Sequence, residues 1–547
     1  MANYNVVSSC SWLPYTRAMP PEVDLSTTLR KYWGYDSFRP LQERIVRSLL
    51  GERDTCVVMP TGGGKSLCYQ LPALLSGKTA VVVSPLIALM QDQAAQLAQM
   101  GIPAAVLNSS ITAAQQASLI NKAHQGEYRL LYISPERLAR ADTMDWLQKV
   151  PIGFFAVDEA HCISEWGHEF RPEYRQLKRL RTSFPDRPIA AFTASATQRV
   201  RHDILSQLQL RNPDKYIASF HRPNLRYLIR ECNSREHQDL LVSALRNHPD
   251  GSVIVYAPTI EAVKLTVNFL KGEGIPAIAY HGKMEADERS RNQELWMSDE
   301  VRVLVGTIAF GLGINKATVR AVIHLSLPKS IEQYYQEAGR AGRDGDPANC
   351  VLLWQKRDAG LLAYFIEQVS DPAEKERSWD RFHTIRRFVE SQGCRHRYIC
   401  SHFGERTKWE TCGSCDTCGV VPEWLAAMSA SKAGSSKPVD RSRIPSISKP
   451  APELMTPSLL SGVDTELREY LRQWRREAAK QQGVPAFVVM HDTTLDQVCR
   501  VQPESVPQLL NVHGIGERKA AMYGEQIFDA LKAFRAGARA QEKTSAS

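Results

Sequence analysis

Residues 59–66 have the composition of a loop that binds phosphate groups. The stretch "MPTGGGKS" lies between an apolar run, "TCVV", and an amphipathic one. Consecutive glycines let backbone N–H groups converge on phosphate oxygens, while a lysine adds charge and a hydroxyl can ligate Mg²⁺. The loop departs from the commonest spacing because Met59 stands at its first position. The alternative is a glycine-rich turn with a surface lysine. The expected nucleotide-binding residues are Thr61, Gly62, Gly63, Gly64, Lys65 and Ser66.

Two carboxylates, Asp158 and Glu159, follow the apolar run "GFFAV" at residues 153–157. An acid at the carboxyl end of a buried parallel strand faces the crevice where ligands bind. Asp158 is therefore expected to hold Mg²⁺ with Ser66, and Glu159 to orient and deprotonate an attacking water. The alternative, an exposed acidic loop, is disfavoured by the phosphate loop earlier in the chain.

A third set of polar residues, Gln336, Arg340 and Arg343, lies in "QEAGRAGRD". The arginines are three positions apart, so on a helical turn they would share a face. An arginine across a cleft stabilises charge on a transferring phosphoryl group only when the cleft closes. The alternative is a solvated basic face.

Four cysteines have the spacing C-x17-C-x2-C-x2-C, which suits a tetrahedral structural Zn²⁺ site. A disulfide framework is disfavoured in a cytosolic chain with reduced thiols. Other donors nearby keep the ligand set open at this point, namely Cys400, His396 and His402. The four cysteines are Cys394, Cys412, Cys415 and Cys418.

Short apolar runs that alternate with amphipathic stretches must position these residues. Runs such as "TAVVVSP" and "RLLYISP" recur to about residue 210, and the rhythm restarts with "SVIVYAP" and "VRVLVGT". Such continuous apolar runs predict buried parallel strands. The expected fold is α/β, with two tandem doubly wound parallel sheets facing across a cleft, then a helical zinc-binding subdomain and a small all-α domain.

Composition shifts suggest where these parts begin and end. A segment rich in Ser, Pro, Ala and Lys reads as a flexible linker. The predicted parts are an N-terminal extension (1–24), a first α/β domain (25–210), a second (211–357), the zinc-binding subdomain (358–428), the linker (429–461), a helical domain (462–536) and a disordered tail (537–547).

The overall composition is that of a soluble protein. The 547 residues carry a net charge of +9, which fits a polyanionic partner without requiring one. The N-terminus lacks the pattern of a signal peptide, and no run reaches the roughly 18 apolar residues that span a bilayer. We therefore expect a cytoplasmic protein with no membrane partner.

Six motifs stand in the order found in superfamily-2 helicases, and residues 25–420 resemble RecQ-family DNA helicases. The resemblance implies RecA-like domains, ATP, Mg²⁺ and structural Zn²⁺ as ligands, and 3′ to 5′ movement on single-stranded DNA. It also implies unwinding of partly duplex DNA in repair and recombination, in the bacterial cytoplasm at the nucleoid. The motifs are "YDSFRPLQ" (35–42), "MPTGGGKS", "DEAHCISEWGHEFRPEY" (158–174), "FTASAT" (192–197), "GTIAFGLGINK" (306–316) and "YYQEAGRAGRDG" (334–345).

The resemblance also implies individual roles at the nucleotide and zinc sites. Gln42 would hydrogen-bond the adenine and Arg39 would lie against it. Leu41 stands where a glycine is more usual. Cys394 holds the family position of the first zinc ligand, so we prefer it to the rival donors.

In the family, an aromatic-rich loop after the DEAH residues senses single-stranded DNA. Carried over, Trp166, Phe170 and Arg171 would meet DNA, and His161 would relay between this loop and the ATP site. Aromatic faces stack on bases of any sequence and arginine binds phosphate, which agrees with that role. The alternative is that both aromatics are core residues.

The last helical segment, 463–535, contains "LRQWRREAAKQQGVPAFVVMHDTTL" and "LLNVHGIGERKAAMYG". On these stretches it resembles the HRDC domain, a nucleic-acid-binding module. Its "GIGERK" stretch is expected to present backbone N–H groups and Lys519 to phosphate. The alternative is a connection between helices of a bundle. A winged-helix domain, common in the family before HRDC, is expected to be missing because only the linker fills that interval.

Two other functions remain open at this stage. The first is an RNA helicase, which the zinc residues, the aromatic loop and "GRAGRDG" disfavour. The second is a non-enzymatic DNA-annealing or scaffold protein, which the full set of catalytic residue types disfavours. A single-strand-binding protein is a candidate protein partner that no motif specifies.

Overall fold

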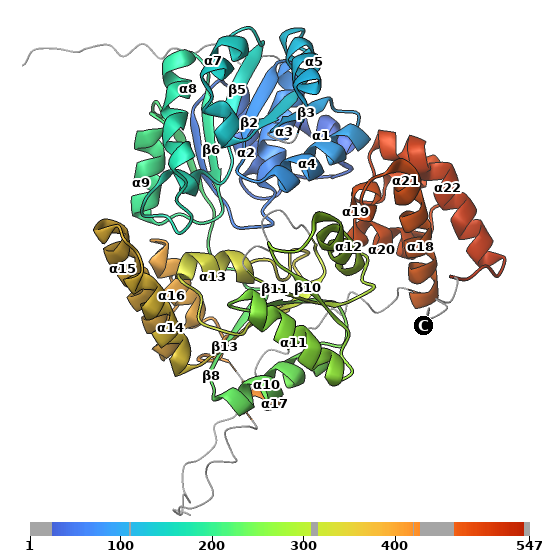
Figure 1. Cartoon of the computed structure of the whole chain (residues 1–547). Helices are drawn as coiled ribbons and strands as arrows, with labels where there is room; N and C mark the ends of the chain where they lie inside the picture. The colour runs from blue at the N-terminus through green and yellow to red at the C-terminus, as the bar shows by residue number, and fades with distance from the viewer. Residues whose placement is uncertain (1–23, 109–110, 308–315, 420, 427–463, 541–547) are drawn as a thin grey trace, which may run out of the picture.

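Two parallel β-sheets form the centre of the molecule (Figure 1). The computed structural model describes residues 24–108, 111–307, 316–419, 421–426 and 464–540. The N-terminal extension, most of "GTIAFGLGINK", the predicted linker with the winged-helix interval, and the end of the tail therefore lie outside the described residues.

The first sheet has seven strands in the order β3-β4-β2-β5-β6-β1-β7, all paired in parallel. Its central strands are apolar throughout, which two helix-covered faces require. The strands are β1 (Thr55–Val58), β2 (Thr79–Val83), β3 (Ala104–Leu107), β4 (Leu130–Ile133), β5 (Ile152–Val157), β6 (Ile189–Thr193) and β7 (Asp214–Ile217). The helices are α1 (Leu25–Trp33), α2 (Gln42–Leu50), α3 (Lys65–Ser76), α4 (Ile87–Gln99), α5 (Ala113–His124), α6 (Pro135–Leu138), α7 (Ala141–Leu147), η1 (Ala160–Ile163), η2 (Pro172–Leu177), α8 (Lys178–Ser183) and α9 (Gln198–Gln207).

The second sheet has six parallel strands in the order β10-β11-β9-β12-β13-β8. Together the two sheets confirm the predicted pair of doubly wound α/β domains. The strands are β8 (Leu225–Glu231), β9 (Ser252–Tyr256), β10 (Ala277–Tyr280), β11 (Val303–Gly306), β12 (Val319–His324) and β13 (Ala348–Trp354). The helices are α10 (Ser234–Arg246), α11 (Ile260–Gly272), α12 (Ala286–Met297) and α13 (Ile331–Ala338).

Two further helical parts complete the fold. Helices α14 (Lys356–Glu367) and α15 (Pro372–Glu390) pack together, and α15 begins with a capping carboxylate, Asp371, followed by a proline. The short helices α16 (Arg395–His402) and α17 (Glu423–Ala426) flank the last three cysteines of the predicted zinc site. The C-terminal helices lie beside α4 and α12 of the two α/β domains (Figure 1). They are α18 (Thr465–Gln482), α19 (Ala486–Val489), α20 (Asp492–Val501), α21 (Val506–Leu510) and α22 (Glu517–Arg535).

The helices of the described part of the chain include none that is both long and apolar enough to cross a membrane.

A buried ion pair lies at one end of the first sheet. Arg181 and Asp54 are 8% and 4% exposed, and their side chains are joined by a short hydrogen bond. Asp54 also accepts from the backbone N–H groups of Ile189, at 2.9 Å, and Arg211, at 2.6 Å. One carboxylate thus joins the start of β6 to the segment leading into β7.

We predict that Asp54→Ala destabilises the first α/β domain by about 3–5 kcal/mol, because it leaves a buried guanidinium without its counter-charge. Denaturant unfolding of the full chain measures the loss. Glu43→Ala is the control, since the exposed Glu43–Arg47 pair should contribute at most about 0.5 kcal/mol. Equal effects of the two substitutions would contradict the prediction.

Candidate active site and zinc centre

The phosphate loop joins β1 to α3, as the sequence predicts. Gly62 and Gly64 have φ of +82° and +80°, the left-handed region that favours glycine. The amine of Lys65, the first residue of α3, donates to the Met59 carbonyl at 3.2 Å. Ser66 accepts a hydrogen bond from the Gln93 side chain at 3.1 Å. These contacts hold an amine and a hydroxyl at the start of a helix, where phosphate and its cation bind.

The segment 35–42 is attached directly to this loop. Gln42 accepts from the backbone N–H of Arg39 at 2.8 Å and donates to the carbonyls of Gly63 and Gly64 at 3.3 and 3.2 Å. The Arg39 guanidinium donates to the Gly62 carbonyl. The structure therefore brings the two expected adenine-binding residues against the phosphate loop.

Leu41, just before α2, has a backbone conformation that usually belongs to glycine. Its φ of +71° lies in the left-handed region, which costs a residue with a Cβ roughly 1–2 kcal/mol. The family resemblance places a glycine more usually at this position. The structure shows Leu41 in the conformation that a glycine adopts readily.

Asp158 and Glu159 follow β5 and are both buried around their carboxylates. Burial and the neighbouring Glu159 charge raise the pKa of Asp158 to about 7. Burial opposes ionisation of Glu159 as well, but the interactions with His161 and Lys65 outweigh it and lower the pKa of Glu159 to about 2. Glu159 also has a left-handed φ of +46°, and its ion-pair partner is His161. The two acids thus form one ionised carboxylate, held by a histidine, beside a second carboxylate.

His161 joins these acids to the motif "FTASAT". Its Nδ1 lies 3.3 Å from Glu159 Oε2 and 3.0 Å from the Thr193 hydroxyl. Thr193 accepts from the backbone N–H of Ser195, whose hydroxyl accepts from Gln336 of α13 at 2.9 Å. Polar contacts therefore run from Glu159 to the second α/β domain. The sequence analysis quoted this motif but assigned Thr193 and Ser195 no role.

The prediction that Arg340 and Arg343 share a helical face is wrong. Helix α13 ends at Ala338, and Gly342 has a φ of +54°, so both arginines lie in an irregular turn. The turn still faces the phosphate loop. The Arg343 Cγ lies only 3.1 Å from where a Cβ would stand at Gly62. Burial, with the nearby positive charge of Arg340, lowers the pKa of Arg343 to about 9.

Arg222 and Asn224 hold this arginine turn in place, and the sequence analysis missed both. Arg222 donates to the Thr61 carbonyl at 3.3 Å and to the Gly342 carbonyl at 2.9 Å. Asn224 donates to the same Gly342 carbonyl at 2.8 Å. The available signal was the stretch "RPN", two side-chain donors just before β8.

Two guanidinium groups lie near the ring of Trp166. The central carbon of Arg199 is 2.9 Å from its ring centre, and that of Arg377, on α15, is 5.5 Å away. Glu165 adds an ion pair to Arg377 at 3.7 Å. The indole is half-buried and packs at the edge of the core, so it is neither a core residue nor a free platform.

The other two residues expected to meet DNA, Phe170 and Arg171, are also half-buried. The Arg175 guanidinium lies 5.6 Å from the Phe170 ring centre. The Arg171 N–H donates to the Cys162 carbonyl at 2.9 Å, which ties the loop back to η1.

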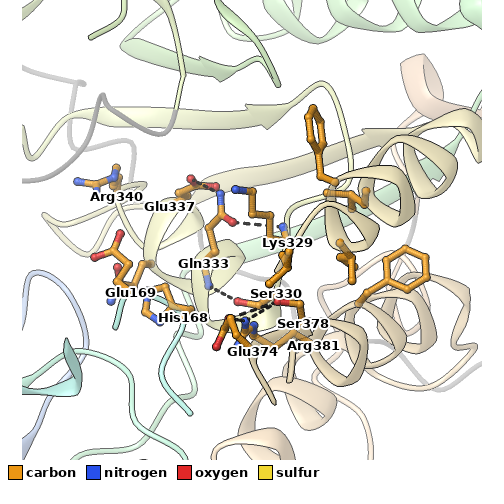
Figure 2. Close-up of a pocket in the computed structure, with 16 residues that line it drawn as sticks. His168, Glu169, Lys329, Ser330, Gln333, Glu337, Arg340, Glu374, Ser378 and Arg381 are labelled. Carbon is orange, nitrogen blue, oxygen red and sulfur yellow. Dashed lines mark hydrogen bonds and ion pairs between the residues drawn. The ribbon is translucent and has the colours of Figure 1, made fainter. Parts of the chain in front are cut away.

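A cavity of about 280 Å³ separates this loop from α13 and the α14–α15 pair (Figure 2). Its lining includes His168 and Glu169 of the loop together with Gln336 and Arg340. His168 stacks on His161 with the rings 4.8 Å apart and nearly parallel. The aromatic-rich loop and the arginine turn therefore border one space, and His168 at its wall stacks on the histidine that contacts Glu159.

The four predicted cysteines meet. The sulfur atoms of Cys394, Cys412, Cys415 and Cys418 lie within 4.8 Å of one another. Backbone N–H groups point at two of the sulfurs, with Cys415 N donating to Cys412 at 3.4 Å and Arg395 N to Cys415 at 3.5 Å. Such donors favour thiolates, so the donor set fits a tetrahedral Zn²⁺.

The rival zinc ligands are not members of this four-sulfur group, although His396 interacts with Cys412 and, against the effect of burial, helps to lower the pKa of that thiol. His396 Nε2 lies 3.1 Å from the Arg222 carbonyl and His402 Nε2 lies 2.7 Å from Glu332. Cys400 is buried in the core. The zinc loop is held to β8, since Asp416 N donates to the Tyr227 carbonyl at 3.0 Å.

"GIGERK" does not present its groups to solvent phosphate, so that expectation is wrong. The Lys519 amine is buried and donates to the Val488 carbonyl at 3.1 Å, and burial lowers its pKa to about 8. The N–H of Gly514 donates to the Gly34 carbonyl at 2.9 Å. The stretch connects helices and contacts α1 of the first domain.

Two parallel α/β domains, with a phosphate loop and paired acids in the first and an arginine turn in the second, define the motor of a helicase. Four family models agree, and together they cover most of the described chain. They are DEAD/DEAH box helicase (39–204), helicase conserved C-terminal domain (236–345), RecQ zinc-binding (356–419) and HRDC domain (464–531).

Comparison with curated relatives identifies the family to which this helicase belongs. The chain is 34% identical to the ATP-dependent DNA helicase RecQ of Haemophilus influenzae, over 93% of this chain and 96% of the relative. It is 33% identical to the protein of that name from Bacillus subtilis, over 92% and 98%. The chain belongs to the RecQ family of ATP-dependent DNA helicases.

A solved structure shares the fold at lower identity. The DUF1998 helicase MrfA, bound to DNA and AMPPNP, aligns with a TM-score of 0.53 at 18% identity, covering 73% of this chain and 55% of that one. The fold class and the family resemblance are both confirmed.

We predict that Cys412→Ser loses the metal and much of the soluble protein, because structural zinc supplies of the order of 10 kcal/mol of folding free energy in small modules. Metal analysis of the purified wild type should give about one zinc per chain, the stoichiometry of a single four-cysteine site. Cys400→Ser is the matched control and should keep its zinc. Wild-type protein with free thiols and no zinc would reject the site.

Proposed function

We propose that this helicase hydrolyses ATP at residues 59–66 and 158–159 and uses the energy to move 3′ to 5′ on single-stranded DNA. It would unwind partly duplex DNA during repair and recombination, in the bacterial cytoplasm at the nucleoid. One observation carries the proposal. Polar contacts join Glu159 through His161, Thr193 and Ser195 to Gln336, so the catalytic acid and the second domain are linked.

The residues present fit ATP and Mg²⁺. The glycine-rich loop offers N–H groups, Lys65 offers a charge, and the ionised carboxylate of Glu159 is held by His161. Ser66 and Asp158 would hold Mg²⁺, which neutralises phosphate charge when bound. Glu159 would accept the proton of the attacking water. Arg340 and Arg343 would stabilise charge on the transferring phosphoryl group.

The aromatic-rich loop is proposed to report DNA to these acids. Trp166, Phe170 and Arg171 are half-buried rather than sealed in the core, which leaves faces that bases and phosphates can reach. For Trp166 to stack fully on a base, its contacts with the Arg199 and Arg377 guanidinium groups would have to loosen. Because His161 is only three residues from Ser164, which precedes this loop, movement of the loop would also move His161.

The experiment that tests the function compares ATP hydrolysis without nucleic acid, with single-stranded DNA and with RNA. We expect strong stimulation by DNA only, and strand displacement from a duplex with a 3′ overhang but not a 5′ one. Lys65→Ala should abolish hydrolysis and unwinding while zinc content stays unchanged, because the two sites lie in separate parts of the fold. Normal turnover by this variant would refute the active-site assignment, and preference for a 5′ overhang would refute the direction.

A second prediction concerns the loop. Trp166→Ala and Phe170→Ala should each lower the stimulation of ATP hydrolysis by single-stranded DNA, and unwinding with it. Binding to a long strand should weaken only modestly, since one stacking contact is worth roughly 1–3 kcal/mol per base. ATP hydrolysis is measured against DNA concentration.

Nucleotide affinity should survive in both variants, because Lys65, Ser66 and Gln42 are untouched, and a fluorescent ATP analogue checks this. Tyr364→Ala removes an aromatic ring that is 60% exposed on α14 and is the matched control. Wild-type stimulation of both loop variants would mean that Trp166 and Phe170 serve packing alone.

A further inference from the structure

The C-terminal helical domain contacts the first α/β domain through two glycines that allow backbone to meet backbone. At Gly34, the C-cap of α1, a Cβ would stand 2.5 Å from the backbone of Ile515. At Gly516 it would stand 2.4 Å from the Lys31 carbonyl. The Gly514 N–H donates to the Gly34 carbonyl at 2.9 Å. Contacts this close require glycine on both sides, so the two surfaces are complementary in detail.

Polar side chains extend this interface. The Tyr523 hydroxyl donates to Gln99 of α4 at 2.8 Å, and Gln99 also donates to Gln482 at 3.1 Å. The same domain reaches the second α/β domain, where Arg472 donates to Asp299 at 2.6 Å. The C-terminal domain is therefore docked on both halves of the motor.

The docked domain places one side chain on the adenine-recognition segment. The imidazole of His513 stacks on the ring of Tyr35, with centroids 4.5 Å apart and planes 20° from parallel. Burial, and then the Arg39 charge, lower the pKa of His513, so the ring is neutral at neutral pH. The Arg39 charge also acts on the pKa of the Tyr35 hydroxyl, so the stacked pair lies near that guanidinium.

The segment between α1 and α2 is held in place by side-chain contacts at both of its ends. Residues 34–41 form no helix or strand, so no backbone ladder fixes their conformation. At one end Gln42 and Arg39 are held on the phosphate loop. At the other end Tyr35 packs against the core of the first α/β domain on the one hand and on the His513 ring on the other.

We propose that His513 is a positioning residue for the segment 35–42, so that the C-terminal domain sets how well the motor discriminates adenine nucleotides from others. The inference rests on the proposed nucleotide site. His513 acts through Tyr35 and Arg39 on the group that reads the base, and it touches neither the phosphate loop nor the acids.

The test measures KM and kcat for ATP and for GTP in the full-length protein with saturating single-stranded DNA. A ring stack is worth about 0.5–1.5 kcal/mol, so His513→Ala should raise KM for ATP about two- to tenfold. The value of kcat and the KM for GTP should stay near wild type, so the preference for ATP falls. His513→Phe keeps a stacking ring and should restore it. His202→Ala, at an exposed histidine on α9, is the control.

Gly516→Ala tests the docking without touching the ring. Gly516 has φ −88°, which alanine adopts readily, so its added methyl clashes only with α1 across the interface. It should reproduce the effect of His513→Ala, with an unchanged zinc content showing that the rest of the chain is folded.

The variant Gln42→Ala shows whether a negative result contradicts the role of His513 or the proposed adenine site itself. Unchanged KM for ATP in Gln42→Ala would refute the proposed adenine site itself. A raised KM in Gln42→Ala with wild-type values in His513→Ala would overturn the role of His513. Parallel losses for ATP and GTP in His513→Ala, or no rescue by phenylalanine, would show a merely structural role and overturn it as well.

Discussion

Side chains bond five carbonyl groups of the phosphate loop, whereas the Pro60 carbonyl accepts from the backbone N–H of Gly63. A peptide that directs its carbonyl outward presents its N–H on the opposite side, and successive peptides of this kind form an anion-binding concavity. The side chains that hold the carbonyls come from the loop itself, from the adenine-recognition segment and from the start of the second domain. The contacts are Lys65 to Met59, Arg222 to Thr61, Arg39 to Gly62, and Gln42 to Gly63 and Gly64.

Because side chains from several parts of the motor bond to the phosphate loop, movement of one part can affect the others through this loop. Arg343 packs on Gly62 and Gln42 occupies the space beside Gly64, so larger residues at either glycine would separate the parts. Arg222 bonds both Thr61 and the arginine turn. A shift of the second domain must therefore change the conformation of the loop or break these contacts, which is the physical basis for linking hydrolysis to domain movement.

The α/β fold and the residue types of the site could be predicted because both leave local signals. Buried parallel strands appear as continuous apolar runs, and chemistry needs particular residues at their ends. Other features have no local signal. The helix before Arg340 and Arg343 stops because of Gly339 and Gly342, although the spacing of the arginines also suits a longer helix. The strain at Leu41 depends on a φ angle that only the folded segment reveals.

The stretch "GIGERK" is the clearest example of a segment whose binding partner could not be predicted from the local sequence. Glycines before a helix expose N–H groups that need an acceptor, and this need is the same whether the acceptor is phosphate or protein. The partner, the Gly34 carbonyl, lies at the other end of the chain and is brought near only by folding. The two anchors of this domain then differ in kind. Backbone contact and ring stacking join it to the first α/β domain, whereas carboxylate–guanidinium pairs, Arg472–Asp299 and Arg476–Glu300, join it to the second. Long side chains can follow a small displacement by rotating, but a backbone contact without room for a Cβ cannot. The contact with the first α/β domain is therefore the more rigid of the two anchors.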